Sequence, residues 1–286
     1  MITEKFVIGS AQFGLRYGIS NTTGQVNFKE IERILNYAIL NKIQFIDTAK
    51  AYGNSEENLG NYIKGSNFKW KIITKFNRSD ISIMDQFNDS INKLNINPYA
   101  VLAHSSDLFI SEFFQKQAPK LLLENPELKI GVSLYDFKEI IKVLDCSFKP
   151  SIVQIPLNIL DIEIYSSGLL AELKKNNIEI HARSIFLQGL LFLNPKHLDR
   201  RFDDVKPILF ELSSIAKNDN LSLAELSLLW VNNLYEVDYI VIGVENKKQL
   251  QKLTLSLKKS CRLETMNDAL SHGYKNKKIL NPALWK

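Results

Sequence analysis

Short apolar runs alternate with amphipathic stretches along most of the chain, and this alternation constrains the fold more than any other feature. The apolar runs have the length and composition of buried β-strands. They are Phe6–Ala11, Phe45–Asp47, Ile72–Lys75, Val101–His104, Lys129–Ser133, Ile152–Pro156, Glu179–Arg183 and Tyr239–Ile242. Helical patterns lie between them, at Phe28–Asn41, Ile83–Leu94, Leu108–Leu123, Phe137–Leu144 and Leu169–Asn176. Strands that alternate with helices predict βαβ units and a parallel sheet.

Eight such strands in a chain of 286 residues predict a closed (β/α)8 TIM barrel rather than an open doubly wound sheet. An open sheet that binds a dinucleotide usually carries a G-x-G-x-x-G turn after its first strand. The segment Gln12–Gly18 follows the first strand here and lacks that spacing. We see no linker or shift in composition, so we expect residues 1–286 to form a single α/β domain.

The region between the seventh and eighth strands departs from the simple alternation. A loop over Phe186–Asp204 comes first, and helices are predicted over Val205–Asn218 and Leu223–Asn233. Loops of this length in compact domains are usually functional or disordered. Ser222 and Glu225 have the spacing of a capping box at the start of the second helix.

Charge and cysteine content exclude several classes of protein. The net charge of +5 is spread along the chain, without the basic stripe typical of nucleic-acid binding. Cys146 and Cys261 are the only cysteines, too few for a disulfide framework or a metal site of their own. The longest apolar run, Ser184–Leu193, is far shorter than the roughly 20 residues of a membrane span. We therefore expect a soluble cytoplasmic protein with no metal, nucleic-acid or membrane partner, and the oligomeric state stays open.

Four chemically active side chains lie at or just after the ends of three consecutive predicted strands. Asp47, Lys75 and His104 close the second, third and fourth strands, and Tyr52 follows the second. Because the carboxyl ends of the strands meet at one rim of a barrel, we expect these groups to converge in an active site. Taken singly, each residue also has a purely structural interpretation. His104 is then a hydrogen-bonded histidine and Lys75 a lysine whose amine reaches out to solvent. Asp47 is then the cap of a turn and Tyr52 a packed aromatic ring.

The motif around Tyr52 resembles the signature of the aldo-keto reductase superfamily. It runs from Phe45 to Gly53 as FIDTAKAYG and continues with Ser55-Glu56 and Leu59-Gly60. Further segments follow in the family's order, namely Ile73–Lys75, Leu102–Asp107, Gly131–Ser133, Val153-Gln154, Ser184–Leu191, Ile242–Val244 and Gln249-Leu250. The resemblance covers about Phe6 to Leu257.

This resemblance implies a barrel that binds a nicotinamide dinucleotide and reversibly reduces an aldehyde or ketone. Tyr52 would be the general acid and base, and the ammonium of Lys75 would lower its pKa. Asp47 would keep Lys75 charged and oriented, and His104 would orient the substrate oxygen. A cofactor-binding regulatory or sensor protein with slow turnover is the alternative function.

The resemblance also implies a cofactor-binding set. Ser133 and Gln154 match residues that bind the nicotinamide carboxamide. Arg183 stands where relatives often have a stacking aromatic ring. Either its guanidinium stacks on the nicotinamide and its charge also attracts an anionic substrate, or it forms an ion pair at the rim. The segment that contains Ser184, Phe186, Gln188, Gly189 and Leu190 would surround the pyrophosphate, with Gly189 permitting close approach.

The segment after the eighth strand is expected to contact the adenosine end of the cofactor, through Gly243, Val244, Glu245 and Gln249. Relatives that bind the 2'-phosphate of NADPH often have basic residues where this chain has Glu245 and Gln249. A carboxylate favours the bare ribose of NADH, whereas Lys247, Lys248 and Lys252 lie close by and favour a phosphate. On the habit of the family we expect NADPH in preference to NADH.

Substrate choice in such barrels depends on the loops at the rim. Here these are Gln12–Gln25, Leu157–Ser167, Phe186–Asp204 and the tail from Arg262 to Lys286, which either closes over the substrate or packs on the barrel base. Residues 11–19 and 183–190 resemble a bacterial branch of the family associated with surface-sugar biosynthesis. A small sugar-derived or nucleotide-linked carbonyl compound is therefore the expected substrate.

Overall fold

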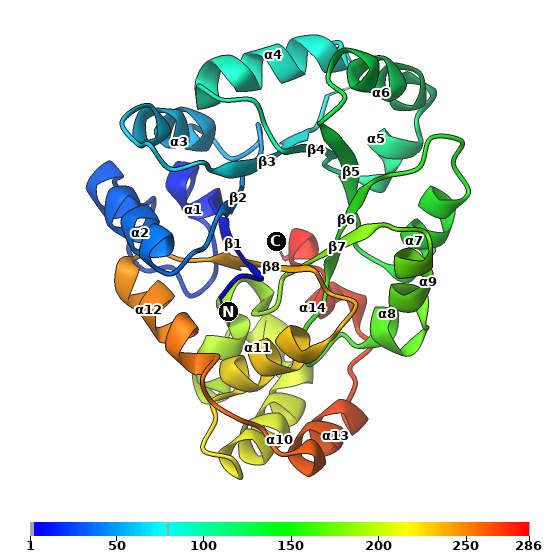
Figure 1. Ribbon diagram of the computed structural model, residues 1–286. Coiled ribbons are helices and arrows are strands. Elements are labelled where there is room, and N and C mark those ends of the chain that lie inside the picture. The colour runs from blue at the N-terminus through cyan, green and yellow to red at the C-terminus, as the bar shows by residue number, and fades with distance from the viewer. Residues whose placement is uncertain (1–2, 79, 286) are drawn as a thin grey trace.

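Eight parallel strands close into a barrel in chain order, with β8 paired to β1 (Figure 1). The structure is a computed structural model that describes residues 3–78 and 80–285. The strands are β1 (Phe6–Gly9), β2 (Phe45–Asp47), β3 (Lys71–Phe76), β4 (Ala100–Ala103), β5 (Lys129–Ser133), β6 (Ile152–Pro156), β7 (Glu179–Arg183) and β8 (Tyr239–Gly243). Helices surround the barrel, and the predicted (β/α)8 fold is confirmed.

The predicted strands are all present, and their ends differ in four cases. β1 stops at Gly9 instead of Ala11, because Ala11 begins a short helix. β3 and β8 each extend to one more residue at the carboxyl end than predicted. β4 ends at Ala103, so His104 lies just beyond the strand, where its N–H donates to Phe76 O over 2.8 Å. His104 therefore still lies at the rim.

Side chains alternate along each strand between the barrel interior and the surrounding helices. The interior begins with an apolar layer that includes Phe45, Ile73, Leu102 and Ile152. The next interior position along each of these four strands is polar, and these positions hold Asp47, Lys75, His104 and Gln154. The barrel interior is therefore apolar in its middle and polar at the carboxyl ends of these strands.

The helices mostly follow the predicted patterns, with one break and several additions. The predicted helix over Leu108–Leu123 is two helices, because Ser111 is extended and its hydroxyl accepts from the N–H of Phe114 to cap the second one. The helices are α1 (Ala11–Gly14), α2 (Phe28–Leu40), α3 (Ser55–Lys64), α4 (Ile83–Leu94), α5 (Ser106–Ile110), α6 (Glu112–Glu124), α7 (Phe137–Leu144), α8 (Glu163–Ser166), α9 (Leu169–Lys175), α10 (Lys206–Lys217), α11 (Leu223–Asn233), α12 (Lys247–Ser256), α13 (Leu263–Ser271) and α14 (Lys277–Leu280). No helix within the described residues has the length and apolarity needed to span a membrane.

The long loop after β7 is ordered rather than structureless. It contains three short 3₁₀ helices, η1 (Leu187–Phe192), η2 (Pro195–His197) and η3 (Arg200–Val205). Phe202 of η3 is 2% exposed, so the loop adds its own apolar contacts to the core. The predicted capping box of α11 is present, with Ser222 and Glu225 each accepting from the other's backbone N–H.

The C-terminal tail passes along one side of the barrel and ends at its mouth. α13 lies beside α10, and the backbone N–H of Tyr274 donates to Leu160 O over 2.9 Å. The Trp285 ring packs edge-on against Phe202, with the two centroids 5.0 Å apart. A last 3₁₀ turn, η4 (Pro282–Leu284), places Pro282 and Ala283 in the lining of a large cavity. The tail therefore ends over the mouth of the barrel and does not pack on the barrel base, which was the other expected course.

Candidate active site

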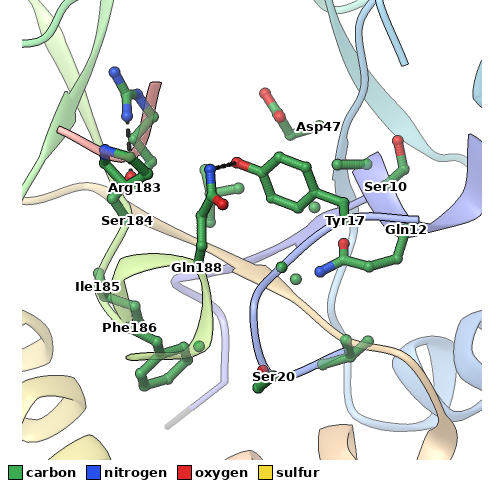
Figure 2. Close-up of a pocket in the computed structure, with 18 of the residues that line it drawn as sticks. Ser10, Gln12, Tyr17, Ser20, Asp47, Arg183, Ser184, Ile185, Phe186 and Gln188 are labelled. Atoms are coloured by element: carbon green, nitrogen blue, oxygen red, sulfur yellow. Dashed lines mark hydrogen bonds between the residues drawn. The ribbon is translucent and has the colours of Figure 1, made fainter. Parts of the chain in front are cut away.

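A cavity of about 620 Å³ opens at the carboxyl ends of the strands. One wall is the end of β7 and the segment after it, where Arg183, Ser184, Ile185 and Phe186 follow one another along the cavity (Figure 2). The opposite wall comes from the segment after β1, which includes Tyr17. The residues after β8 and the tip of the C-terminal tail complete the lining.

The four predicted catalytic side chains meet at the deep end of this cavity. Lys75 Nζ donates to Asp47 Oδ2 over 2.6 Å, to Thr48 O over 3.0 Å and to the Tyr52 hydroxyl over 3.4 Å. Lys75 and Asp47 are only 1% and 3% exposed. The His104 ring stands edge-on to the Tyr52 ring, with centroids 5.8 Å apart. Tyr52, His104 and Asp47 line the cavity, and Lys75 lies behind them.

The electrostatics of Tyr52 differ from the expectation. Burial raises the pKa of the phenol, and the Asp47 carboxylate raises it further, while Arg183 opposes both. The net direction is thus opposite to the expected lowering of the Tyr52 pKa, because burial of the phenol disfavours its charged form. Burial also lowers the pKa of His104 to about 4, helped by the charge of Lys75. At neutral pH the site thus holds a protonated phenol and a neutral imidazole.

The loop that carries Tyr52 is held by close backbone packing against α1. An ideal Cβ on Gly14 would lie 1.7 Å from Tyr52 O and 2.7 Å from Ser55 N, so only glycine fits there. The Ser55 hydroxyl accepts from Thr48 over 3.1 Å and lies 2.7 Å from the Ser10 hydroxyl. These contacts join the ends of β1 and β2 to the start of α3 and fix where the phenol lies.

This geometry agrees with the sequence comparison. The family model described as Aldo/keto reductase family matches residues 5–111 and 128–269 of the chain. The chain belongs to the aldo/keto reductase family. No curated protein matches it.

Solved structures of other aldo/keto reductases share the fold. The glycerol dehydrogenase AKR11B4 from Gluconobacter oxydans has a TM-score of 0.72 at 18% identity, over 97% of this chain and 92% of that one. The aldo-keto reductase AKR11C1 from Bacillus halodurans, in its holo form, has a TM-score of 0.75 at 16% identity, over 96% of this chain and 94% of that one. At these identities the likeness extends to the fold alone.

Almost all residues expected to contact the cofactor line the cavity of this aldo/keto reductase. They are Ser133, Gln154, Arg183, Ser184, Phe186, Gln188, Gly189, Gly243, Val244, Glu245 and Gln249. Leu190 is the exception, because its side chain is fully buried in the hydrophobic core and lies outside the cavity lining.

Gln154 and Ser133 already have partners in the protein. Gln154 Nε2 donates to Asp47 Oδ1 over 2.8 Å, so both oxygens of this carboxylate are bound and the Gln154 oxygen remains for another donor. Ser133 Oγ accepts from Arg183 Nε over 3.3 Å. Gln154 therefore belongs to the hydrogen-bond network of Asp47 and Lys75, whereas Ser133 is joined to Arg183. The linear sequence reveals neither link.

Arg183 contacts only neutral groups within the described part of the chain. The guanidinium carbon lies 4.3 Å from the centroid of the Tyr135 ring, so the arginine stacks on a protein side chain. Its hydrogen bonds go to Ser133, to Ser184 Oγ over 3.0 Å and to Leu134 O over 2.8 Å. None of the ion pairs within residues 3–78 and 80–285 includes Arg183, so an ion pair at the rim is excluded there.

The segment after β7 has backbone groups suited to a phosphate. The N–H groups of Ser184, Ile185 and Phe186 donate to no acceptor within the described part of the chain, and Ser184 has a left-handed φ of 55°. Consecutive free N–H groups in such a turn form an anion-binding concavity. The residues present therefore fit the pyrophosphate of a nicotinamide dinucleotide.

Gly189 is also required by packing within the protein. An ideal Cβ there would lie 2.0 Å from Ser20 Oγ, so this position permits close approach of the loop after β1 and not only of a cofactor. The same two loops are joined by Ile19 N–H to Gln188 O, over 2.9 Å, and by Gln188 Nε2 to the Tyr17 hydroxyl, over 3.1 Å (Figure 2).

The far end of the cavity holds charges of both signs. Glu245 accepts from Thr23 Oγ1 over 3.3 Å, and Gln249 Oε1 accepts from the Glu245 N–H over 2.7 Å. Of the three lysines considered from the sequence, only Lys252 lines the cavity. The amine of Lys247 instead lies 5.8 Å from the centroid of the Tyr37 ring.

Sequence reasoning missed several lining residues. Tyr135 lies just beyond β5, and nothing in the local pattern marks it as the partner of Arg183. Gln12 is 9% exposed, and its Oε1 has no hydrogen-bond partner within the described residues. Its position directly after β1, in the rim loop Gln12–Gln25, was the available signal.

Proposed function

We propose that this aldo/keto reductase reduces an aldehyde or ketone to an alcohol, with the Tyr52 hydroxyl as the proton donor. The observation that carries the proposal is the contact of Tyr52 with the buried Lys75–Asp47 pair, beside His104 at the deep end of the cavity. A structural role for any one of these groups does not explain why all four converge there.

Tyr52 has the protonation state that reduction requires. Its raised pKa keeps the hydroxyl protonated at neutral pH, so it has a proton to give to the carbonyl oxygen as negative charge develops there. The proton leaves the phenol in that step, and the ammonium of Lys75, 3.4 Å away, stabilises the phenolate that forms. A solvent proton then restores the phenol.

The other residues orient the reacting groups. Asp47 holds Lys75 by a 2.6 Å hydrogen bond, and Gln154 holds Asp47 in turn. His104 is neutral at neutral pH, because its pKa lies at about 4, so one ring nitrogen carries a hydrogen and donates to the substrate oxygen. Together Tyr52 and His104 polarise the carbonyl group.

A reduced nicotinamide cofactor, when bound, supplies the hydride that adds to the carbonyl carbon. Ser133 and the free oxygen of Gln154 would hold its carboxamide, and the amides of Ser184, Ile185 and Phe186 its pyrophosphate. Glu245 and Lys252 would face the adenosine end. We propose NADPH as the preferred form, because Lys252 brings a positive charge into the cavity there.

A sugar-derived carbonyl compound is the proposed substrate. The resemblance of residues 11–19 and 183–190 to a branch associated with surface sugars supports it. So does the fold shared with a glycerol dehydrogenase, an enzyme whose name denotes a polyol substrate. A screen of sugar aldehydes and keto-sugars beside simple aromatic aldehydes tests this choice, and reduction of the aromatic aldehydes alone would contradict it.

Tyr52→Phe is the decisive test of the function. Removing the proton donor should lower kcat for reduction by about 10²- to 10⁴-fold while leaving cofactor affinity unchanged. Cofactor absorbance measures turnover, and protein fluorescence titration measures affinity. Tyr235→Phe is the matched control, because Tyr235 is 82% exposed and lies outside the cavity. Equal turnover of the two variants would remove Tyr52 as the acid, and tight cofactor binding with negligible wild-type turnover would indicate a sensor.

A further inference from the structure

The charge of Arg183 is balanced by no acidic group of the site. Its three hydrogen bonds end on neutral acceptors, the hydroxyls of Ser133 and Ser184 and the carbonyl of Leu134. No ion pair of Arg183 is present within residues 3–78 and 80–285. A guanidinium stays charged at any physiological pH, so this positive charge persists at the cavity wall.

The guanidinium also keeps unused donors. It has five N–H groups, and the contacts to the protein use one on Nε, one on Nη1 and one on Nη2. One N–H on each terminal nitrogen remains. Stacking on the Tyr135 ring at 4.3 Å holds the plane in position, so these donors are oriented before a ligand arrives.

The catalytic end of the cavity therefore carries a net positive charge. Asp47 and Lys75 form a neutral pair there, with their charged atoms 2.6 Å apart. Tyr52 and His104 are uncharged at neutral pH. The remaining carboxylate in the lining, Glu245, lies beyond β8 and already accepts a hydrogen bond from Thr23. Arg183 thus supplies a cationic site beside the reacting groups.

We propose that the substrate carries an anionic group, a carboxylate or a phosphate, which Arg183 binds while the carbonyl lies against Tyr52 and His104. This inference rests on the proposed carbonyl reduction and narrows it to acidic or phosphorylated carbonyl compounds. Arg183 is held against the end of β5 by Ser133, Leu134 and Tyr135. It lies close enough to Tyr52 and His104 for its charge to lower the pKa of both groups. The pyrophosphate has its own donors in the three free amides that follow Arg183.

Two matched substrate pairs test the proposal on the wild-type protein. The first is 4-carboxybenzaldehyde against its neutral methyl ester, and the second is glyceraldehyde 3-phosphate against glyceraldehyde. We expect kcat/KM to favour the anionic member of at least one pair by about 10- to 100-fold, the usual effect of a charge-assisted hydrogen bond. The preferred pair identifies the group as a carboxylate or a phosphate, and equal values within both pairs would overturn the proposal.

Arg183→Met removes the charge and keeps an unbranched side chain of similar length. It should abolish the preference, so that the ratio of kcat/KM for the anionic member to kcat/KM for the neutral member falls about 10- to 100-fold. Arg200→Met is the control, because Arg200 is exposed in η3 and lies outside the cavity. An equal loss on both members, together with weaker cofactor binding by fluorescence titration, would show that Arg183 serves the cofactor instead and would overturn the proposal.

A binding measurement separates this inference from the proposed function. Calorimetry with 4-(hydroxymethyl)benzoate, its neutral methyl ester and glycerol 3-phosphate on the complex with oxidised cofactor requires no turnover. Tighter binding of an anion that is lost in Arg183→Met supports the anionic site even if no carbonyl is reduced, in which case the proposed reduction alone fails. No difference between charged and neutral compounds overturns the anionic site.

Discussion

At the scale of single residues, burial decides the protonation of the site more than neighbouring charges do. Tyr52 lies 3.4 Å from an ammonium and still has a raised pKa. His104 has a pKa of about 4, mainly because burial disfavours the imidazolium. A site with a protonated phenol and a neutral imidazole is suited to give a proton to a carbonyl oxygen, which is the direction of reduction.

The proposed preference for NADPH also belongs to this scale, and it involves Glu245 and Lys252. Lys252→Met should weaken NADPH binding about tenfold and leave NADH almost unchanged, because only NADPH presents a 2'-phosphate to the ammonium. Glu245→Gln should strengthen NADPH binding, since it removes a carboxylate that repels the phosphate. Fluorescence titration with both reduced cofactors measures this, and Lys248→Met, an exposed lysine outside the cavity, is the control. Parallel changes for both cofactors would exclude a contact with the 2'-phosphate.

At the scale of secondary-structure elements, the short helix α1 positions the catalytic loop. It consists of four residues, all buried, directly after β1. Its last residue, Gly14, lets the backbone of α1 contact the backbone at Tyr52, where any side chain would collide. α3 then starts three residues after Tyr52, and Ser55 bonds back to Ser10. The phenol is therefore held between two helix ends rather than by a flexible loop.

Gly14→Ala should disturb both stability and catalysis. A Cβ at 1.7 Å from Tyr52 O forces the two backbones apart, which should cost about 1–3 kcal/mol in the free energy of unfolding and move the phenol. Urea unfolding and steady-state kcat are the measurements. Gly65→Ala is a matched control at the end of α3, because its nearest neighbour to an added Cβ lies 3.8 Å away. Wild-type stability and turnover in Gly14→Ala would show that this packing is dispensable.

At the scale of the whole molecule, the two ends of the barrel have different tasks. The carboxyl end holds the cavity, whereas the amino end is closed by a charged cluster around Glu179. This carboxylate accepts from Lys129 over 2.6 Å and from the Tyr99 hydroxyl over 3.0 Å, and it lies 2.6 Å from Nε2 of the fully buried His181. The cluster ties β4, β5 and β7 together far from the chemistry, as expected for a face that serves stability.

Glu179→Gln should therefore destabilise the fold without changing catalysis. Losing the charge beside Lys129 and His181 should lower the free energy of unfolding by about 1–2 kcal/mol, because solvent screens the half-exposed Lys129. Urea unfolding at pH 7 measures this. Glu127→Gln, an exposed glutamate near β5, is the control. A loss of turnover at equal stability would contradict the division between the two ends.

The same variant has a defined dependence on pH. Burial would raise the pKa of Glu179, but hydrogen bonds from His181 and Lys129 outweigh it and bring the pKa to about 2. Because the folded pKa is depressed, the stabilisation is complete above the unfolded pKa of about 4.3 and is lost as pH falls toward 2. The stability difference between wild type and Glu179→Gln should shrink over that range.

The sequence by itself determined the barrel and the identity of the four groups at its rim. Strand periodicity is local, and parallel strands bring their carboxyl ends together, so Asp47, Lys75 and His104 had to meet whatever their loops do. Tertiary structure decided what depends on distance and burial. Contacts between segments far apart in the chain decide several features of the site. They set the partner of Arg183, the packing that requires glycine at Gly189, the core position of Leu190, the course of the tail and the raised pKa of Tyr52. No local pattern encodes such contacts, because they depend on how closely separate elements pack and how much water they exclude.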